Sequence, residues 1–233
     1  MTSGIKLRDV LAQEIKSGKY VSGDKVFSER EYAKQMGISR MTARDALEQL
    51  QGEGFLYKIE RRGYFVSEEY LRTDPTNHKN IFKMIDDSGR KATAKTNKAK
   101  IYDVSESLSK LFACSTNKKV YNINGVSYMD DRKICYEENY LLADTFENFL
   151  NLEYYEPITD FIEDKYSISL VQTGFRAVST QLRANVSDAL GVKDGTPGLF
   201  ITRLKSYNGK VIQIDREFWL SDIIEIVVGN FPE

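Results

Sequence analysis

Arginine and hydroxyl side chains gather in one short segment, SRMTARDALEQL, which runs from residue 39 to residue 50. Arg40 and Arg44 are spaced one helical turn apart, and Ser39 and Thr42 stand beside them. Arginine binds guanine bidentately in the major groove of DNA, and short hydroxyl side chains reach phosphates or base edges. The first turn of a helix also points backbone N–H groups outward, which suits a phosphate. The segment therefore indicates DNA binding.

The same segment carries an apolar stripe that would dock it onto a core. Ala43, Ala46, Leu47 and Leu50 recur at helical spacing, and the alanines would let a second helix approach closely. The alternative interpretation is a small helical core with charged flanks, because arginines four residues apart are often merely solvated. The order of the neighbouring elements favours the DNA-binding interpretation.

The residues before this segment predict two further helices. Residues 5–17 place apolar side chains at the spacing of an amphipathic helix. In FSEREYAKQMG, Ser28 and Glu31 have capping-box spacing, and Gly37 can end the helix in the left-handed conformation. Ser39 is then the predicted N-cap of the third helix. Two short helices joined by a glycine turn are typical of a helix-turn-helix.

The residues after the segment predict a β-hairpin. Residues 55–59 and 64–66 are rich in aromatic and β-branched side chains, and ERRG lies between them. Gly63 is free to adopt a positive φ in that turn. Arg61 and Arg62 at the tip would reach the minor groove or the phosphate backbone. A hairpin with this charge, directly after a helix-turn-helix, is typical of a wing.

A change of pattern after the hairpin divides the chain into three parts. Residues 1–70 form the predicted winged helix-turn-helix, the polar residues 71–80 a linker, and residues 81–233 a second domain. The second domain contains a loose repeat, in which Ser109 corresponds to Ser187 and each copy combines a short helix with two strands around a tight turn. The two hairpins are expected to join in one antiparallel sheet, with helices such as residues 145–165 packed on one side, which makes an α+β fold.

Composition excludes several other classes of protein. No apolar run approaches the roughly 18 residues that a membrane-spanning helix needs. Cys114 and Cys135 are the two cysteines, too few for a disulfide framework, and they fit a reducing cytoplasm. The single histidine, His78, is expected at the surface and excludes a histidine-rich metal site. The net charge of −1 means that DNA binding must rest on where the charges lie.

The motifs of the first 70 residues resemble the winged helix-turn-helix of the GntR family of bacterial transcription regulators. The resemblance covers about residues 5–67 and includes SER, SRMTARDAL and the GYFV of the wing. It implies that Arg30, Arg40, Thr42, Arg44 and Gly63 contact DNA. Val26-Phe27 and Arg61 depart from the family pattern, which has Leu-Pro before the second helix and a glycine at the first position of the wing.

The second part resembles the UTRA effector domain of the HutC-type branch of that family. The resemblance covers about residues 80–230 and is carried by the two hairpins, CYEENYL and SDALGVKDGTPG. It implies a fold related to chorismate lyase, with a pocket for a small metabolite such as a sugar, a sugar phosphate or another anion. Ligand binding in that pocket would change the affinity for operator DNA.

The same resemblance places the effector-binding residues. Glu137 matches an acidic residue of the family, and Gln213 and Trp219 fall where relatives place ligand-facing side chains. Relatives that bind phosphorylated sugars carry arginines at the positions of Gly125 and Ser127. A phosphate needs charge-assisted donors, which glycine lacks, so the sequence favours a neutral or weakly charged ligand. Glutamine can hydrogen-bond a sugar hydroxyl, and tryptophan can stack on a sugar ring.

The sequence therefore predicts a DNA-binding transcription regulator, a repressor rather than an activator, that works as a homodimer on operator DNA and needs no cofactor or metal. Two alternatives remain open. One is a lyase-like enzyme that uses carboxylates alone, through Glu137 or Glu217. The other is a DNA-binding structural protein that ignores metabolites.

Overall fold

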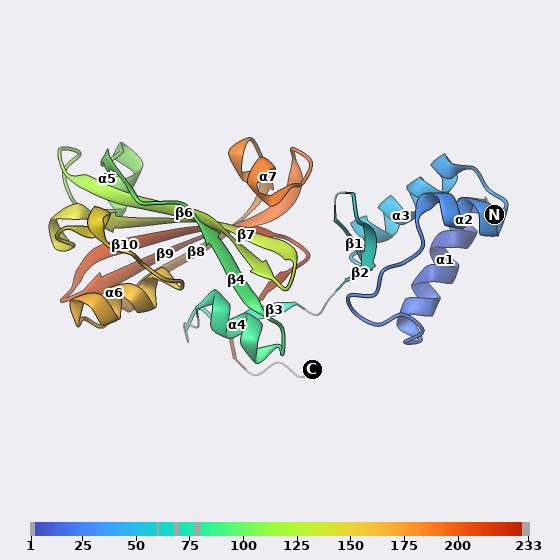
Figure 1. Ribbon diagram of the computed structural model, residues 1–233, viewed down its shortest axis with the longest axis horizontal. Coiled ribbons are helices and arrows are strands. Elements are labelled where there is room, and N and C mark those ends of the chain that lie inside the picture. Colours follow the sequence, from blue (N-terminus) through green and yellow to red (C-terminus); the bar gives the residue numbers. More distant parts are fainter. Residues whose placement is uncertain (1–2, 60, 68–69, 77–79, 230–233) are drawn as a thin grey trace. The chain divides into compact units, whose positions relative to one another are not determined.

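The computed structural model describes residues 3–59, 61–67, 70–76 and 80–229, with side chains from residue 6 onward. The chain divides into two compact units, residues 1–70 and residues 71–233. Figure 1 labels the helices and strands of each unit. Each unit has its own hydrophobic core, as separate domains do.

Three helices and a hairpin make the first unit: α1 (Ser3–Lys16), α2 (Glu29–Met36), α3 (Arg40–Gly52), β1 (Leu56–Ile59) and β2 (Gly63–Val66). Helix α2 begins with the predicted capping box between Ser28 and Glu31, and it ends at Gly37 with φ +64°. Helix α3 begins at the N-cap Ser39, whose hydroxyl accepts the Thr42 N–H. The local caps fix both ends of the turn between the two helices, as the sequence predicted.

The apolar stripe of α3 forms the centre of this core. Ala43, Leu47 and Leu50 have no exposed surface, and α1 and α2 both pack against α3. Small alanines let the helices approach closely while leucines fill the space between them. Because the stripe is buried, the opposite side of α3, with its two arginines, faces solvent.

The hairpin is regular, with Leu56 opposite Val66 and Ile59 opposite Gly63. At its tip Arg61 has a φ of +62°. A side chain at positive φ crowds the backbone and costs roughly 1–2 kcal/mol, which explains why glycine is the usual residue at this position of the family pattern.

An antiparallel seven-stranded sheet forms the body of the second unit, in the order β4-β6-β7-β10-β9-β8, with β5 also paired to β6. The strands are β3 (Leu71–Thr73), β4 (Ala92–Thr96), β5 (Lys100–Asp103), β6 (Lys119–Met129), β7 (Arg132–Leu142), β8 (Val171–Leu182), β9 (Thr196–Tyr207), β10 (Lys210–Leu220) and β11 (Ile224–Ile226). The helices are α4 (Ile81–Asp87), α5 (Glu106–Phe112), α6 (Ile158–Tyr166) and α7 (Asn185–Leu190), with short 3-10 turns at Ala143–Thr145 and Phe149–Asn151. The two predicted hairpins, β6–β7 and β9–β10, join through β7 and β10, which confirms the arrangement that the repeat indicated.

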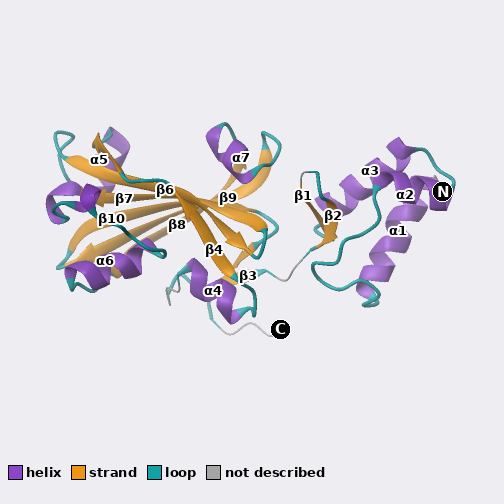
Figure 2. Cartoon of the chain, viewed as in Figure 1, coloured by secondary structure: helices purple, strands orange, loops and turns teal. Residues whose placement is uncertain are grey.

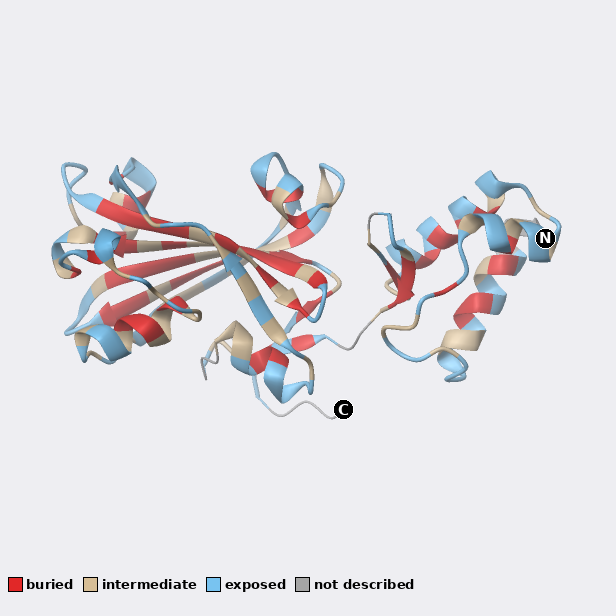
Figure 3. Cartoon of the chain, viewed as in Figure 1, coloured by how far each residue is buried: buried red, intermediate tan, exposed pale blue. Residues whose placement is uncertain are grey.

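Helices lie on both sides of this sheet. Figure 2 shows the strands as one layer, with α4 and α6 on one side and α5 and α7 on the other. Figure 3 shows that buried residues occupy the middle of the strands and the helix sides turned toward them. The antiparallel sheet with helices on it is the α+β fold that the sequence predicted.

Two details of the predicted organisation are wrong. Residues 71–73 are the strand β3, parallel to β11, so this part of the predicted linker belongs to the second unit. The segment 145–165 is not one helix, because Pro157 lacks the N–H that a helix interior needs and Asn148 has a φ of +57°. The α-helix of this segment is α6, which begins directly after that proline. His78 lies outside the described residues.

Candidate functional site

The first candidate site is the N-terminal half of α3. Arg40 and Arg44 are both exposed, one turn apart, on the side opposite the buried stripe. The Arg44 Nε donates a hydrogen bond to the Glu48 Oε1 at 2.8 Å, and both side chains are nearly half exposed. An exposed pair of this kind is worth little, so Arg44 can exchange Glu48 for another anion at small cost.

The two hydroxyl groups of the segment hold the start of α3. The Ser39 Oγ accepts the Thr42 N–H at 3.0 Å and lies 2.8 Å from the Thr42 Oγ1. These bonds orient the first turn and its remaining backbone N–H groups toward solvent. The predicted DNA contacts of Ser39 and Thr42 stay predictions, while the predicted N-cap role of Ser39 is confirmed.

The other predicted DNA contacts lie on α2 and on the hairpin. Arg30 is exposed in the first turn of α2, and Arg61 and Arg62 are exposed at the tip of the hairpin beside Gly63. The Arg62 guanidinium lies 5.6 Å from the centre of the Phe65 ring. This contact directs one of the two tip arginines back along β2.

Two residues that the sequence reading missed stand beside these arginines. Met41, between Arg40 and Thr42, is 62% exposed, which is unusual for so apolar a side chain. Lys25 forms an isolated bridge to Phe65, and its side chain lies against Gly63 at the wing. The exposure of Met41 could have been inferred from its place next to Arg40, off the apolar stripe.

The second candidate site is on the sheet face under α4 and α6. Glu137 lies directly across from Glu217 of β10 and from Gly125 of β6, while Asp215 lies across from Arg203. Residues that face each other across antiparallel strands share a side of the sheet. The register therefore collects charged side chains from three strands, β7, β9 and β10, on one face.

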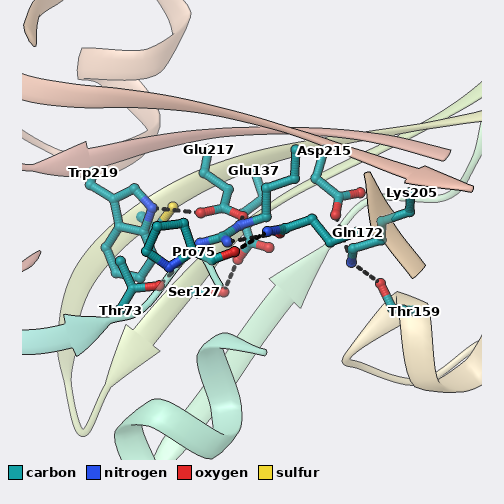
Figure 4. A network of polar contacts seen from close by, with 12 residues as sticks. Thr73, Pro75, Ser127, Glu137, Thr159, Gln172, Lys205, Asp215, Glu217 and Trp219 are labelled. Carbon is teal, nitrogen blue, oxygen red and sulfur yellow. Dashed lines mark hydrogen bonds and ion pairs between the residues drawn. The ribbon is translucent and has the colours of Figure 1, made fainter. Parts of the chain in front are cut away.

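Ion pairs connect most of these charges, as Figure 4 shows for part of the network. Arg203 Nε donates to Glu217 Oε1 at 2.7 Å, and Lys205 Nζ lies 2.7 Å from Asp215 Oδ2. Trp219 Nε1 donates to the second oxygen of Glu217 at 2.8 Å. All these groups are nearly or fully buried, and buried charges need such partners.

Glu137 is different, because its partner in the described part of the chain is the Ser127 hydroxyl, which donates a hydrogen bond to it, rather than a cation. Burial and, to a smaller extent, the nearby Glu217 carboxylate raise the pKa of Glu137 to about 8. Glu137 keeps some exposed surface because it lines a cavity. A carboxyl that is largely protonated near neutral pH can donate a hydrogen bond, and it can also ionise when a cation arrives.

The cavity offers about 30 Å³ to the centres of water-sized molecules, within about 440 Å³ of empty space that includes open solvent. Its charged lining consists of Glu137, Glu156, Asp215, Glu217, Arg203 and Lys205. A smaller neighbouring cavity shares Glu137 and Glu156 and reaches Ser127 and Gly125. Polar groups that converge on a concave site are typical of small-molecule sites.

The predicted effector residues meet at this place, but unequally. Glu137 and Ser127 line the two cavities. Trp219 lines the larger cavity but is only 1% exposed, which leaves little ring surface for stacking on a sugar. Gln213 is fully buried and donates to Thr159 and Asp215, so it supports the cavity wall. A ligand contact of these four residues stays a prediction.

The sequence reading missed the two cations of the cavity. Arg203 and Lys205 are two residues apart in β9, and Asp215 and Glu217 are two residues apart in β10. Charges that alternate on paired strands of a hairpin are a detectable signal, because the period of two places them on one face. The family resemblance indicated arginine positions in β6 alone, at Gly125 and Ser127.

Gly125 has a packing reason of its own. A Cβ at this position would lie 2.7 Å from the Lys95 carbonyl oxygen and 2.9 Å from the Thr96 Cα. Strand β4 approaches β6 too closely there for any side chain. The absence of an arginine at Gly125 is therefore tied to the pairing of β4 with β6.

A winged helix-turn-helix followed by a sheet domain with a polar cavity defines the class of two-domain transcription regulators. Residues 6–66 match the gntR family of bacterial regulatory proteins, and residues 87–225 match the UTRA domain. The chain belongs to the GntR family, in the HutC-type branch that carries a UTRA domain.

Named relatives agree with this assignment. The uncharacterized HTH-type transcriptional regulator YihL of Escherichia coli K12 is 25% identical over 224 residues, 95% of each chain. The HTH-type transcriptional repressor NagR of Bacillus subtilis is 26% identical over 198 residues, 85% of this chain and 82% of that protein. The crystal structure of PhnF from Mycobacterium smegmatis shares the fold, with a TM-score of 0.65 at 18% identity over 97% of this chain and 99% of that one.

Two further observations concern the described residues alone. None of their helices is both long and apolar enough to span a membrane. No group of three or more histidine, cysteine, aspartate or glutamate side chains among them is arranged to hold a metal ion.

Proposed function

We propose that this protein is a sequence-specific DNA-binding repressor whose affinity for operator DNA is controlled by a small molecule in the cavity of the second unit. The observation that carries the proposal is the exposed pair Arg40 and Arg44 at the start of α3, backed by a fully buried stripe. A helix docked in this way can present its first turns to the major groove. The relation to NagR and to repressors of the same family supports repression, and such a regulator would act in the cytoplasm.

On DNA, α3 would lie in the major groove with Arg40 and Arg44 at guanine edges or phosphates. Met41 would meet apolar groups such as the thymine methyl, since a methyl contact suits its exposed side chain. The wing arginines Arg61 and Arg62 would follow the adjacent backbone or minor groove. Ser39 and Thr42 would add phosphate contacts at the helix start.

A homodimer would place two such helices on two half-sites about one turn of DNA apart. The sheet face opposite the cavity supports this, because an apolar row crosses it from Tyr136 through Phe218 and Phe200 to Val178. Phe200 and Phe218 stack at 4.7 Å between ring centres, and Val178 is 46% exposed. Two copies burying the same patch would form a closed twofold dimer.

Control by the ligand would be a shift between two arrangements of the dimer that differ in DNA affinity. The ligand must bind the two arrangements unequally, and its effect on DNA binding equals the effect of DNA on ligand binding. The cavity supplies the place for that difference, since its walls come from α4, α6 and the three strands β7, β9 and β10.

The first experiment is selection of DNA from a random library with the purified full-length protein, followed by titration of the selected duplex. A specific operator should bind at least a thousandfold more tightly than scrambled DNA at the same salt concentration. Affinities that differ only slightly, and that fall equally steeply with salt, would contradict the proposal.

A lyase-like activity has one observation in its favour, the facing carboxyls of Glu137 and Glu217 in the cavity. Two carboxyl groups in different environments can serve as acid and base. Incubation of any stabilising ligand with the protein, followed by mass spectrometry, separates the two functions. A regulator returns the ligand unchanged, while an enzyme consumes it.

A further inference from the structure

The cavity of the second unit holds more carboxyl groups than cations. Four acidic residues line it, Glu137, Glu156, Asp215 and Glu217, against the two cations Arg203 and Lys205. Both cations are already committed, because Arg203 pairs with Glu217 and Lys205 with Asp215, each at 2.7 Å. The two remaining carboxyl groups have no cationic partner among the described residues.

Of these two, Glu156 is satisfied by other donors. One of its oxygens accepts the Ile158 N–H at 2.9 Å, and the other accepts the Thr96 hydroxyl at 2.6 Å. Ile158 begins α6, so this carboxylate already occupies the helix N-terminus that an anionic ligand would otherwise use. A phosphate or carboxylate ligand would meet Glu156 there and would gain no free cation elsewhere in the described lining.

Glu137 lacks such support. The Ser127 hydroxyl is its hydrogen-bond donor, and the residue opposite it on β10 is another carboxyl, Glu217. A carboxylate accepts hydrogen bonds only, and a donor that carries positive charge satisfies it best.

We propose that the ligand of this cavity is an organic cation, a primary amine whose ammonium group lies against the Glu137 carboxylate. The inference rests on the proposed function, in which this cavity binds the effector. An ammonium group offers three donors and a full charge, and it would balance the negative excess that the ion pairs leave. The open side of the cavity leaves room for the rest of the molecule.

Proton release follows from this chemistry. When the amine binds as an ammonium ion, Glu137 gives its proton to solvent and becomes the partner carboxylate, so charge is conserved in the site. Binding of the amine should strengthen as pH rises toward the pKa of Glu137. It should then stay strong until the amine itself loses its proton near pH 10. The groups that face Glu137 are Ser127 and Gly125 from β6, Glu217 and Asp215 from β10, Arg203 and Lys205 from β9, and Glu156 before α6.

Three probes on one four-carbon chain test the charge preference: 1,4-diaminobutane, 1,4-butanediol and succinate, each at about 10 mM with the full-length protein. The diamine should raise the melting temperature by a few degrees, and the diol and the dianion should not. The shift should be larger at pH 8 than at pH 6, and titration calorimetry in two buffers should show proton release. A neutral ligand held by protonated Glu137 would show the opposite pH trend.

Glu137→Gln should abolish the response to the diamine, since glutamine keeps the shape but not the charge. Glu138→Gln is the matched control, because Glu138 is its neighbour in β7, lies on the other face of the sheet and accepts from Tyr140. The proposal is overturned if the diamine gives no shift, if Glu137→Gln retains it, or if succinate or the diol gives a larger one.

Operator binding by the same preparations separates this inference from the proposed function. If the protein binds a specific operator and its melting temperature responds to the diol or to succinate, the proposed function is supported and the preference for an amine is wrong. If it binds no specific operator, the proposed function fails, while the amine response of the cavity can still be measured.

Discussion

Arginine–glutamate pairs occur in both units of this protein, in opposite surroundings. Arg44 and Glu48 lie on the surface of α3, each nearly half exposed, at 2.8 Å. Arg203 and Glu217 lie inside the second unit at 2.7 Å, with side chains 2% and 11% exposed. Water screens the first pair and leaves Arg44 available to DNA, while the second pair is fixed because neither charge can return to water. In the proposed function the same two residue types would thus serve DNA binding in the first unit, while they line a cavity in the second.

The largest expected effect comes from breaking the buried pair. Arg203→Met should lower the free energy of unfolding of the second unit by about 3–5 kcal/mol, because Glu217 is left buried without its cation. Urea denaturation of the variant against wild type measures it. Arg44→Ala should cost no more than about 0.5 kcal/mol. A double variant, Arg203→Met with Glu217→Gln, should regain much of the lost free energy of unfolding. Equal losses for Arg203→Met and Arg44→Ala would contradict the contrast between the buried and the exposed pair.

The next effect concerns pH. The folded pKa of Glu137 is about 8, above that of the unfolded chain, so the folded state holds the proton longer. The contribution of Glu137 to the free energy of unfolding has its full value below about pH 4.5 and decreases as pH rises toward 8. Glu137→Gln should remove this pH dependence. Above pH 8 the free energy of unfolding of the variant should exceed that of wild type by on the order of 3 kcal/mol.

Denaturation curves of both proteins between pH 5 and pH 9 measure this difference in the free energy of unfolding, because the window spans the folded pKa of Glu137. Glu156, whose pKa burial also raises, remains in both proteins, so only the difference between them is informative. Parallel pH profiles for wild type and Glu137→Gln would show that Glu137 ionises without cost.

DNA binding should respond to the exposed arginines by smaller amounts. Arg40→Ala and Arg44→Ala should each weaken operator binding by about 1–3 kcal/mol, while the melting temperature stays within a degree or so. Fluorescence anisotropy with the selected operator measures the loss. Arg183→Ala, which removes an exposed arginine of the second unit, is the control. Wild-type binding by both α3 variants would remove α3 as the reading helix.

The smallest expected effect is at the wing. Arg61→Gly should raise the free energy of unfolding of the first unit by up to about 1 kcal/mol, because glycine adopts the φ of +62° without crowding. Operator binding should weaken slightly, as one cation near the backbone is lost. Urea denaturation and anisotropy on the same sample separate the two effects, and a loss of stability would show that the Arg61 side chain makes a contact worth more than its strain.

Local signals account for what could be predicted in the first unit. The capping box at Ser28, the glycine turn at Gly37 and the apolar stripe of α3 act over three or four residues, and the structure confirms each. In the second unit the two hairpins and their joining in one sheet were also predictable, since their turns are local. Residues 71–73 were not, because β3 becomes a strand only by pairing with β11 about 150 residues later.

The sequence by itself determined which helix carries arginines, where the hairpins turn and that the chain joins a GntR-type reading unit to a UTRA domain. Only the tertiary structure decided that Glu137 faces Glu217, that Arg203 and Lys205 supply the cavity's cations, and that Gly125 is held small by β4. The physical reason is the separation in sequence over which the interactions act. Caps and turns depend on residues a few positions away in the chain. The charge of a cavity depends on strand register, which packing of the whole sheet fixes.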